Sequence, residues 1–161
     1  MTKKIILSLL LVSGGMYGKT IGIENHNGGN IRVHSIKGWS GAVGLNEWKH
    51  IIFATDLDGI RAIRRVLRGY DRKHRLDKLG PICWRWVGPA KTYEQLLQKK
   101  GYLRSICQKM NMTETSFVDL RDRHVMMRLA KAIVYSENGS QPYPDSLYRE
   151  AFNIGCKKCQ Q

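Results

Sequence analysis

The sequence has 161 residues, and its 27 Lys+Arg against 13 Asp+Glu give a formal net charge of +14. This length suits one domain, since domains most often have roughly 100–150 residues. A hydrophobic share of 42% excludes a chain that is disordered throughout, and 16 Gly with 4 Pro exclude a fibrous or low-complexity protein. Four Cys are too few for a miniprotein held by disulfides alone. The composition therefore indicates a small, strongly basic, folded domain.

The N-terminus has the pattern of an export signal. Two lysines near the start precede an apolar run at 5–12, and small residues follow. A run of about 8 apolar residues is too short to span a bilayer as a helix but suits a signal peptide. We expect a signal peptide at 1–18, cut after Gly15 or Gly18, and a single periplasmic or secreted domain at 19–161. A buried N-terminal element or a retained anchor is the alternative, and no later stretch is apolar enough to span a membrane.

The four cysteines leave more than one kind of site open. Cys83, Cys107, Cys156 and Cys159 permit three disulfide pairings. Structural disulfides are favoured in an exported protein, and one bridge from the tail to the helical body is the simplest arrangement. A four-cysteine zinc site and a redox pair in the tail are the alternatives. We expect neither a metal nor another cofactor.

The first part of the mature chain, 21–48, predicts a small β-lobe. Asn27-Gly28-Gly29-Asn30 is a turn signal, because Gly and Asn tolerate positive φ. Residues 31–34 then alternate apolar and polar side chains, as a short strand does. A second turn is expected at Lys37-Gly38, and together these features predict a hairpin or an irregular β-lobe.

The rest of the chain predicts five short helices. Thr55 or Asp56 can cap the first of them, whose apolar residues repeat every three or four positions up to Tyr70. The capping box of Thr92 and Gln95 begins another helix, which Gly101 is expected to end. The other apolar stripes predict the remaining helices in the same way. The expected helices cover about 56–72, 77–87, 92–101, 103–110 and 119–136. The predicted fold is therefore mainly α (α+β), a compact helical domain with a small N-terminal β-lobe.

The first of these helices has one strongly cationic face. Its arginines follow helical spacing opposite the apolar stripe: Arg61, Arg64, Arg65, Arg68 and Arg72. Such a face attracts an anionic polymer, and DNA, lipopolysaccharide, teichoic acid and the cell wall all fit that description. A merely solvated face is the alternative, although the net charge makes it weaker than usual.

One carboxylate stands out as a candidate general acid. Glu137 lies eleven positions after Met126, which returns it to nearly the same helix face, at the end of an otherwise apolar stripe. Partial burial there raises a carboxyl pKa, and glycoside cleavage needs such a proton donor. Glu24 and Asp145 are candidates for a second carboxylate. Fraying of the helix at Ser136, or plain solvation of these loop carboxylates, is the alternative.

Several side chains could bind a sugar substrate beside this acid. Asn30 lies in the glycine-rich turn, and Trp39, Trp84 and Tyr143 offer aromatic stacking surfaces. Core packing is the alternative for each aromatic residue. No nucleophile-elbow sequence (GxSxG) or Walker-type phosphate loop is present, so hydrolases and nucleotide-binding proteins of those types are not indicated.

Asn27-Gly28-Gly29-Asn30-Ile31-Arg32 followed by Gly38-Trp39-Ser40-Gly41 resembles the N-x-G-N-I-R … W-x-G opening of small phage and prophage virion proteins. The resemblance continues through Gly59-Ile60-Arg61-Ala62 and Arg85-Trp86 and covers roughly 22–145. Its last part, Ala132-Ile133-Val134 with Glu137-Asn138-Gly139, is similar to lysozyme-like muramidases and lytic transglycosylases. That likeness implies a lysozyme-like fold and gives Glu137 the role of catalytic acid.

Two functions follow from these observations. The first is an exported, phage-related enzyme that cleaves peptidoglycan with Glu137 as general acid, its basic helices holding an anionic envelope polymer. The second is a non-enzymatic, virion- or envelope-associated protein that binds an anionic polymer or other virion proteins. Nucleic acid binding has only the charge in its favour.

Overall fold

The structure is a computed structural model that describes residues 19–155, and its fold is mainly helical with one small sheet. This confirms the predicted α+β class. No helix in the described part of the chain is long and apolar enough to cross a membrane. The predicted signal peptide at 1–18 lies outside the described residues. The elements, in chain order, are α1 Ile21–Glu24, β1 Ala42–Leu45, β2 Ile51–Phe53, α2 Asp56–His74, α3 Leu79–Val87, α4 Tyr93–Met110, α5 Arg123–Asn138 and α6 Asp145–Ala151.

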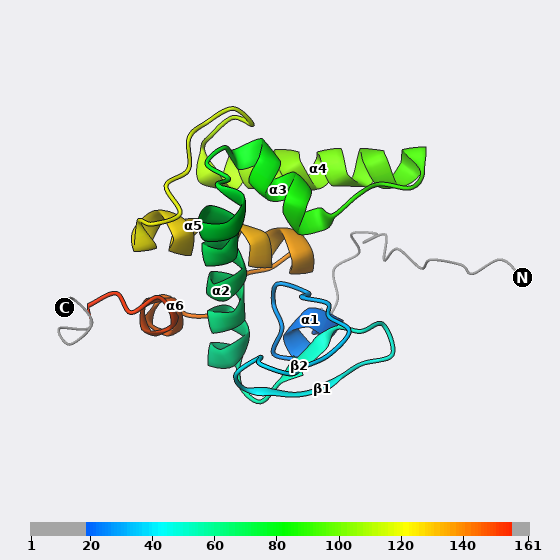
Figure 1. The fold of residues 1–161 in the computed structure, drawn as a ribbon, viewed down its shortest axis with the longest axis vertical. Helices are drawn as coiled ribbons and strands as arrows, with labels where there is room; N and C mark the ends of the chain where they lie inside the picture. Colours follow the sequence, from blue (N-terminus) through cyan, green and yellow to red (C-terminus); the bar gives the residue numbers. More distant parts are fainter. Residues whose placement is uncertain (1–18, 156–161) are drawn as a thin grey trace, which may run out of the picture.

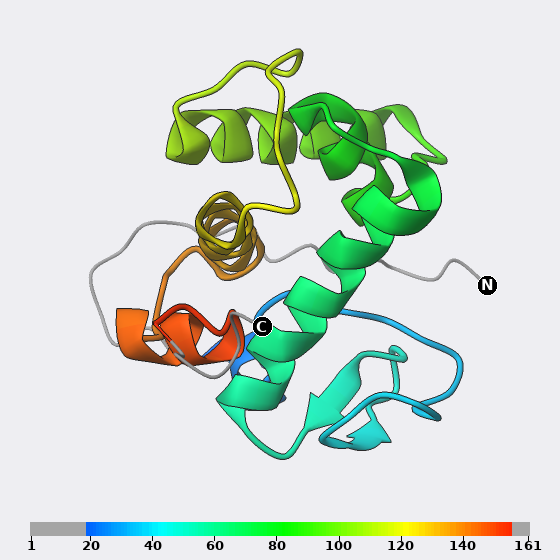
Figure 2. The same ribbon diagram turned by 60° about the vertical axis from the view of Figure 1, so that its left-hand side comes forward.

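The long helix α2 joins two parts of the molecule (Figures 1 and 2). At its beginning lies an N-terminal lobe of α1, β1 and β2, and at its end lies a helical lobe of α3 and α4. The Thr55 side chain caps α2 by accepting a hydrogen bond from Asp58 N at 3.2 Å, as predicted. The helix ends where Arg75 turns into the left-handed region at φ 51°. The two lobes are therefore held by one continuous rod.

Helix α5 lies at the centre of the core. Its residues Leu129, Ala130, Ile133 and Val134 are each at most 1% exposed, and α5 contacts α1, α2 and α4. It begins later than predicted because the Asp122 side chain caps it. This side chain accepts hydrogen bonds from His124 N and Val125 N. Because α5 contacts both lobes, its end reaches the region between them.

The sheet differs from the prediction. The strand expected at 31–34 is absent, and Arg32 forms only an isolated bridge with His50, while β1 and β2 pair antiparallel with Gly44 opposite Ile52. The cause is the fully buried Asn27 side chain, which accepts a hydrogen bond from Ile31 N at 2.9 Å and donates one to Ile31 O at 3.0 Å. These side-chain bonds occupy Ile31 N, and the segment keeps only scattered ladder bonds among the described residues, from Ile51 N to Ile31 O and from Val33 N to Lys49 O.

The predicted break at Gly101 is also wrong, because α4 runs unbroken from Tyr93 to Met110. A glycine inside a helix costs about 1 kcal/mol relative to alanine, which packing can offset. Here Leu103, Ile106 and Met110 are buried, and the helix packs on α5 and α3. The two short helices expected at 92–101 and 103–110 are thus one.

Candidate active site

Glu137 lies in the last turn of α5, and this turn is held firmly. Asn138 donates hydrogen bonds to Gly28 O at 2.7 Å and Val134 O at 2.8 Å. Gly139 ends the helix in the left-handed conformation at φ 70°, with its N–H bonded to Tyr135 O at 2.7 Å. The alternative that α5 frays at Ser136 is therefore wrong. The backbone of Glu137 is held in place within the last turn of the helix.

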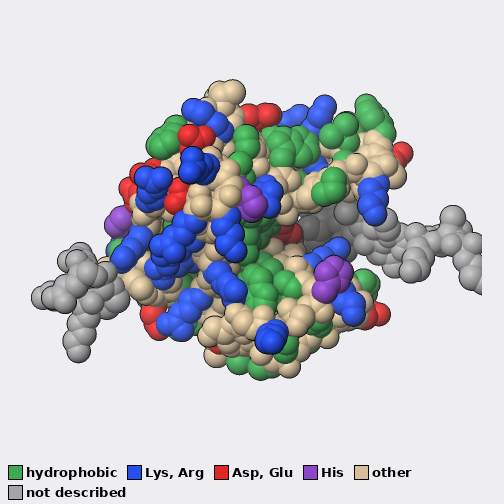
Figure 3. Space-filling view, viewed as in Figure 1, with side chains coloured by type: hydrophobic (Ala, Val, Ile, Leu, Met, Phe, Trp, Pro, Cys, Tyr) green, Lys and Arg blue, Asp and Glu red, His purple; other side chains and the backbone are tan. Residues whose placement is uncertain are grey.

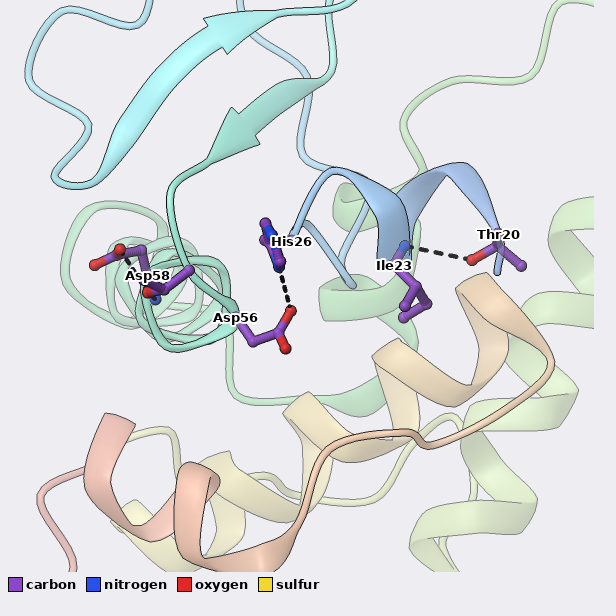
Figure 4. Close-up of polar contacts among 6 residues, drawn as sticks. Thr20, Ile23, His26, Asp56 and Asp58 are labelled. Carbon is purple, nitrogen blue, oxygen red and sulfur yellow. Dashed lines mark hydrogen bonds and ion pairs between the residues drawn. The ribbon is translucent and has the colours of Figure 1, made fainter. Parts of the chain in front are cut away.

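A second tie joins this turn to the N-terminal lobe. The Thr20 hydroxyl donates a hydrogen bond to Asn138 Oδ1 at 2.5 Å. Its oxygen also caps α1 by accepting a hydrogen bond from Ile23 N at 3.4 Å (Figure 4). In the same region His26 Nδ1 lies 2.7 Å from Asp56 Oδ1, at the beginning of α2 (Figure 4). These contacts fix α1 against both α5 and α2.

Two side chains from distant parts of the sequence donate hydrogen bonds to the Glu137 carboxylate. Asn30 Nδ2 lies 3.0 Å from Glu137 Oε2, and Trp86 Nε1 lies 3.1 Å from Glu137 Oε1. Asn30 comes from the N-terminal lobe and Trp86 from the end of α3, so the carboxylate is held from both lobes. Each of its oxygens thus has a donor that fixes its orientation.

The pKa of Glu137 is raised above its ordinary value. Desolvation by burial is the largest cause, and the hydrogen bonds from Asn30 and Trp86, the nearby Tyr102 hydroxyl and the charge of Arg32 oppose it. The Tyr102 hydroxyl is itself buried, and no acceptor lies within hydrogen-bond distance and angle of it among the described residues. The result is a carboxyl group that keeps its proton to a higher pH than a solvated glutamate does.

The position of Asn30 depends on close packing of the Asn27–Asn30 turn. A Cβ on Gly28 would lie 2.8 Å from the Tyr143 ring, and a Cβ on Gly29 would lie 2.9 Å from Ile63. Only glycine fits at these two positions without displacing core side chains. Asn30 itself adopts φ 49°, a conformation that asparagine tolerates. The turn was predicted, but its glycines are required mainly by contact with the core.

Figure 3 shows that the molecular surface is hollowed between the helical lobe and the N-terminal lobe. Hydrophobic side chains line this hollow, and basic side chains lie around it (Figure 3). Glu137 is half-buried, and its two donors come from the two lobes that flank the hollow. The arrangement places a protonatable carboxyl group between the two lobes.

Neither candidate for a second carboxylate joins this site. The exposed Glu24 lies in α1 and makes no side-chain hydrogen bond or ion pair within the part of the chain described. Asp145 begins α6, is 70% exposed at its side chain and lies 2.5 Å from Lys131 Nζ, a contact that lowers its pKa. Among residues 19–155 no acidic side chain perturbs the pKa of Glu137. The site therefore has one acid, where the sequence suggested two.

The structure separates the predicted sugar-binding residues. Asn30 is part of the site, as a hydrogen-bond donor to the acid. Tyr143 does not offer the predicted stacking surface, since it is only 7% exposed. Its ring packs edge to face on Tyr148 in the core, with 6.2 Å between the ring centroids. The half-buried Trp39 stacks under the Arg65 guanidinium at 4.5 Å. Trp84 lines a separate surface pocket of about 530 Å³ with Pro89 and Tyr93.

The predicted cationic face forms a groove along α2. Its volume is about 540 Å³, and the residues that line it are Arg61, Arg64, Arg65, Arg68, Gly69, Arg72, Lys73 and Asn153. All five predicted arginines are among them. Figure 3 shows the basic side chains gathered over α2 on this face of the molecule. Neither hydrogen-bond donor to Glu137 lines this groove, which makes the groove a separate feature.

The cysteines do not form the expected bridge from Cys83 or Cys107. Both carry free thiols, and burial raises the pKa of Cys83 to about 12, so that thiol stays protonated at neutral pH. Cys156 and Cys159 lie outside the described residues. Within residues 19–155 no three His, Cys, Asp or Glu side chains gather as metal ligands.

No protein-family model matches the chain. It is 28% identical over 137 residues to Protein P5 of Pseudoalteromonas phage PM2, across 83% of this chain and 81% of that protein. The chain is similar to a phage protein.

Three residues of the site were not among the predicted ones. Trp86 was interpreted as core packing because it lies on an apolar stripe, yet its indole N–H binds the acid. Tyr102 and Arg32 also act on the pKa of Glu137. Arg85-Trp86 and the Arg32 of the glycine-rich segment were part of the noted resemblance, which was the one signal that could have marked them. Tyr102 had no such signal.

Proposed function

We propose that this protein cleaves the glycan of peptidoglycan, with Glu137 as general acid in a lysozyme-like arrangement. The observation that carries the proposal is the state of Glu137. It is half-buried between two lobes, its pKa is raised by burial, and one donor holds each of its oxygens. A general acid needs a proton near neutral pH and a fixed direction in which to deliver it. The raised pKa and the two fixed donors support this role for Glu137.

In the proposed first step the carboxyl group of Glu137 gives its proton to the glycosidic oxygen. The bond between this oxygen and the anomeric carbon breaks, and the leaving sugar departs with a new hydroxyl group. Asn30 and Trp86 then stabilise the Glu137 carboxylate that forms, since each donates a hydrogen bond to it. Asn30 and Trp86 are thus positioning residues in this scheme.

The nucleophile in this scheme comes from the substrate. Two-carboxylate glycosidases hold their acids about 5–10 Å apart, and no second acid acts on Glu137 among the described residues. We therefore infer that the 6-hydroxyl of the cleaved sugar attacks its own anomeric carbon and gives its proton to the Glu137 carboxylate. This restores the acid and leaves a 1,6-anhydro sugar. The reaction class is that of a lytic transglycosylase.

A second candidate is a non-enzymatic component of a phage particle. The similarity to Protein P5 and the cationic groove favour it. It predicts no release of wall fragments at any pH. The enzymatic proposal places the protein in a phage-related role at the cell wall, to which the expected signal peptide would export it.

The deciding experiment is digestion of purified peptidoglycan by the full chain, followed by mass analysis of the released fragments. We expect fragments lighter by one water than hydrolysis products, which is the mark of the anhydro end. Fragments of hydrolysed mass would support a glycosidase with water as nucleophile and overturn the transglycosylase step. No fragments from wild-type protein that is folded by circular dichroism would reject the enzyme and favour the particle component.

A further inference from the structure

The cationic groove along α2 is built for a densely charged polyanion. Six cations line it, which are Arg61, Arg64, Arg65, Arg68, Arg72 and Lys73. Since a helix rises about 1.5 Å per residue, this row spans about 18 Å of the α2 axis, with a mean spacing of about 3.6 Å between cations. Duplex DNA carries one phosphate per about 3.4 Å of its helix axis on each strand. The linear charge density of the groove therefore matches that of one DNA strand.

Two cations in the second half of the groove lack an acidic partner among the described residues, whereas Arg64 donates a hydrogen bond to Ala151 O at 3.0 Å. Arg61 faces Glu150 at 3.6 Å, and Arg65 is held by Gly38 O and by the Trp39 ring. Arg68 and Arg72 have no side-chain partner within the part of the chain that the structure describes. Between them Gly69 adds no side chain, and a Cβ there would meet nothing within 4 Å. This part of the groove is thus open and positively charged.

The lining also distinguishes between kinds of polyanion. No aromatic side chain lines the groove, and single-stranded nucleic acid is bound largely by stacking of its bases on such side chains. No large apolar side chain lines it either, as insertion into a lipid surface requires. Wall polymers are single chains, whereas the two strands of duplex DNA together carry one negative charge per about 1.7 Å of helix axis. The kind of polyanion that fits this lining best is one that a protein contacts through closely spaced phosphates alone.

We propose that this groove binds the phosphate backbone of duplex DNA without sequence preference. The guanidinium groups contact successive phosphates of one strand, and affinity comes from release of the counterions that these phosphates hold. The site is independent of Glu137 and goes beyond the proposed wall activity. It gives the molecule a second surface with a different ligand.

The test is fluorescence anisotropy of a short labelled DNA duplex with the full chain across a salt series. The variant Arg68→Gln/Arg72→Gln removes these two cations of the groove, and Lys91→Gln/Lys100→Gln removes the same charge outside the groove. We expect the groove variant to lose at least about tenfold in affinity and to reduce the magnitude of the salt slope by about 1.8, while the control changes far less. Glu137→Gln should bind as wild type does, which separates this result from the wall assay.

Three outcomes would overturn the proposal. Equal losses in the groove variant and in the lysine control would show that binding follows net charge alone. Tighter binding of poly(glycerol phosphate), or of vesicles with anionic lipid, at equal phosphate concentration would assign the groove to wall polymer or membrane. Absence of duplex binding at low salt would leave the groove without this ligand.

Discussion

Glu137 ends one helix and Asp145 begins the next, yet their environments shift their pKa values in opposite directions. Glu137 has its charge disfavoured by burial, so its pKa is raised. Asp145 is exposed and lies 2.5 Å from Lys131 Nζ, so its pKa is lowered. Both carboxylates were candidates for the same chemistry. The comparison teaches that desolvation at a junction of lobes, and not sequence neighbourhood, makes a carboxyl group suitable as a proton donor.

The largest expected effect tests this comparison directly. We expect Glu137→Gln to reduce wall clearing by about 10²–10⁴-fold, the usual contribution of a general acid. Asp145→Asn should change it by less than about twofold, because Asp145 is bound to Lys131 on the surface. Turbidity of purified walls measures both, and circular dichroism confirms the fold. If Asp145→Asn were the more damaging change, the roles assigned to the two acids would be reversed.

A smaller effect is expected from the donor that orients the acid. We expect Asn30→Ala to lower clearing about tenfold, since Glu137 Oε2 loses its partner at 3.0 Å. The Asn30 hydrogen bond lowers the pKa of Glu137, so its loss raises that pKa. The alkaline limb of the rate profile should then move to higher pH, because the acid stays protonated longer. Asn30→Asp tests the same position more strongly than Asn30→Ala, because it replaces the hydrogen-bond donor with a like charge beside Glu137.

A purely structural role for Asn30 would give a different pattern. It would lower the rate equally at every pH and would also lower the thermal midpoint. Measurement of the full pH profile with the melting curve therefore separates positioning of the acid from support of the fold.

Local patterns were sufficient for part of this structure. The spacing of apolar residues predicted α2 and α5 nearly to their ends, and it placed Glu137 on the core side of α5 because residues eleven apart share a helix face. The cationic face of α2 followed from the same periodicity. Each of these features depends on residues within one helix, where sequence distance and spatial distance correspond.

The remaining features depend on contacts between distant segments. Asn30 and Glu137 are 107 positions apart, and Trp86 and Glu137 are 51 apart. No periodicity can report that three such side chains meet. The same limit explains the unbroken α4, where packing on α5 outweighs the helix-breaking tendency of Gly101. It also explains Tyr143, which was a candidate for a sugar-stacking surface although its ring is in the core.

The opposite pKa shifts also predict opposite effects on stability. The raised pKa of Glu137 means that its contribution to folding is full below its ordinary pKa and is lost as pH rises through the higher folded value. Glu137→Gln should therefore raise the thermal midpoint at pH 8 more than at pH 4. The lowered pKa of Asp145 means that its contribution is present above its ordinary pKa and is lost as pH falls. Asp145→Asn should thus lower the midpoint slightly at neutral pH.

Melting curves of both variants across pH 4–8 check this pair of signs. In a domain of this size 1 kcal/mol corresponds to about 2–4 °C, so the rise for Glu137→Gln should be a few degrees. A Glu137→Gln midpoint that falls below wild type at high pH would show that the ionised carboxylate stabilises the fold. Glu137 would then be a structural anchor.

The smallest effect is expected from Tyr102. Its buried hydroxyl lies close enough to Glu137 to lower the pKa of the acid, although its hydrogen-bonding geometry is not satisfied in the described residues. Tyr102→Phe should leave the maximal rate within about threefold and move the alkaline limb slightly upward, in the same direction as Asn30→Ala but less far. Removal of a buried hydroxyl without a good partner should cost little stability. A downward shift of the limb would mean that Tyr102 raises the pKa of the acid, and the balance of forces argued for Glu137 would be wrong at this residue.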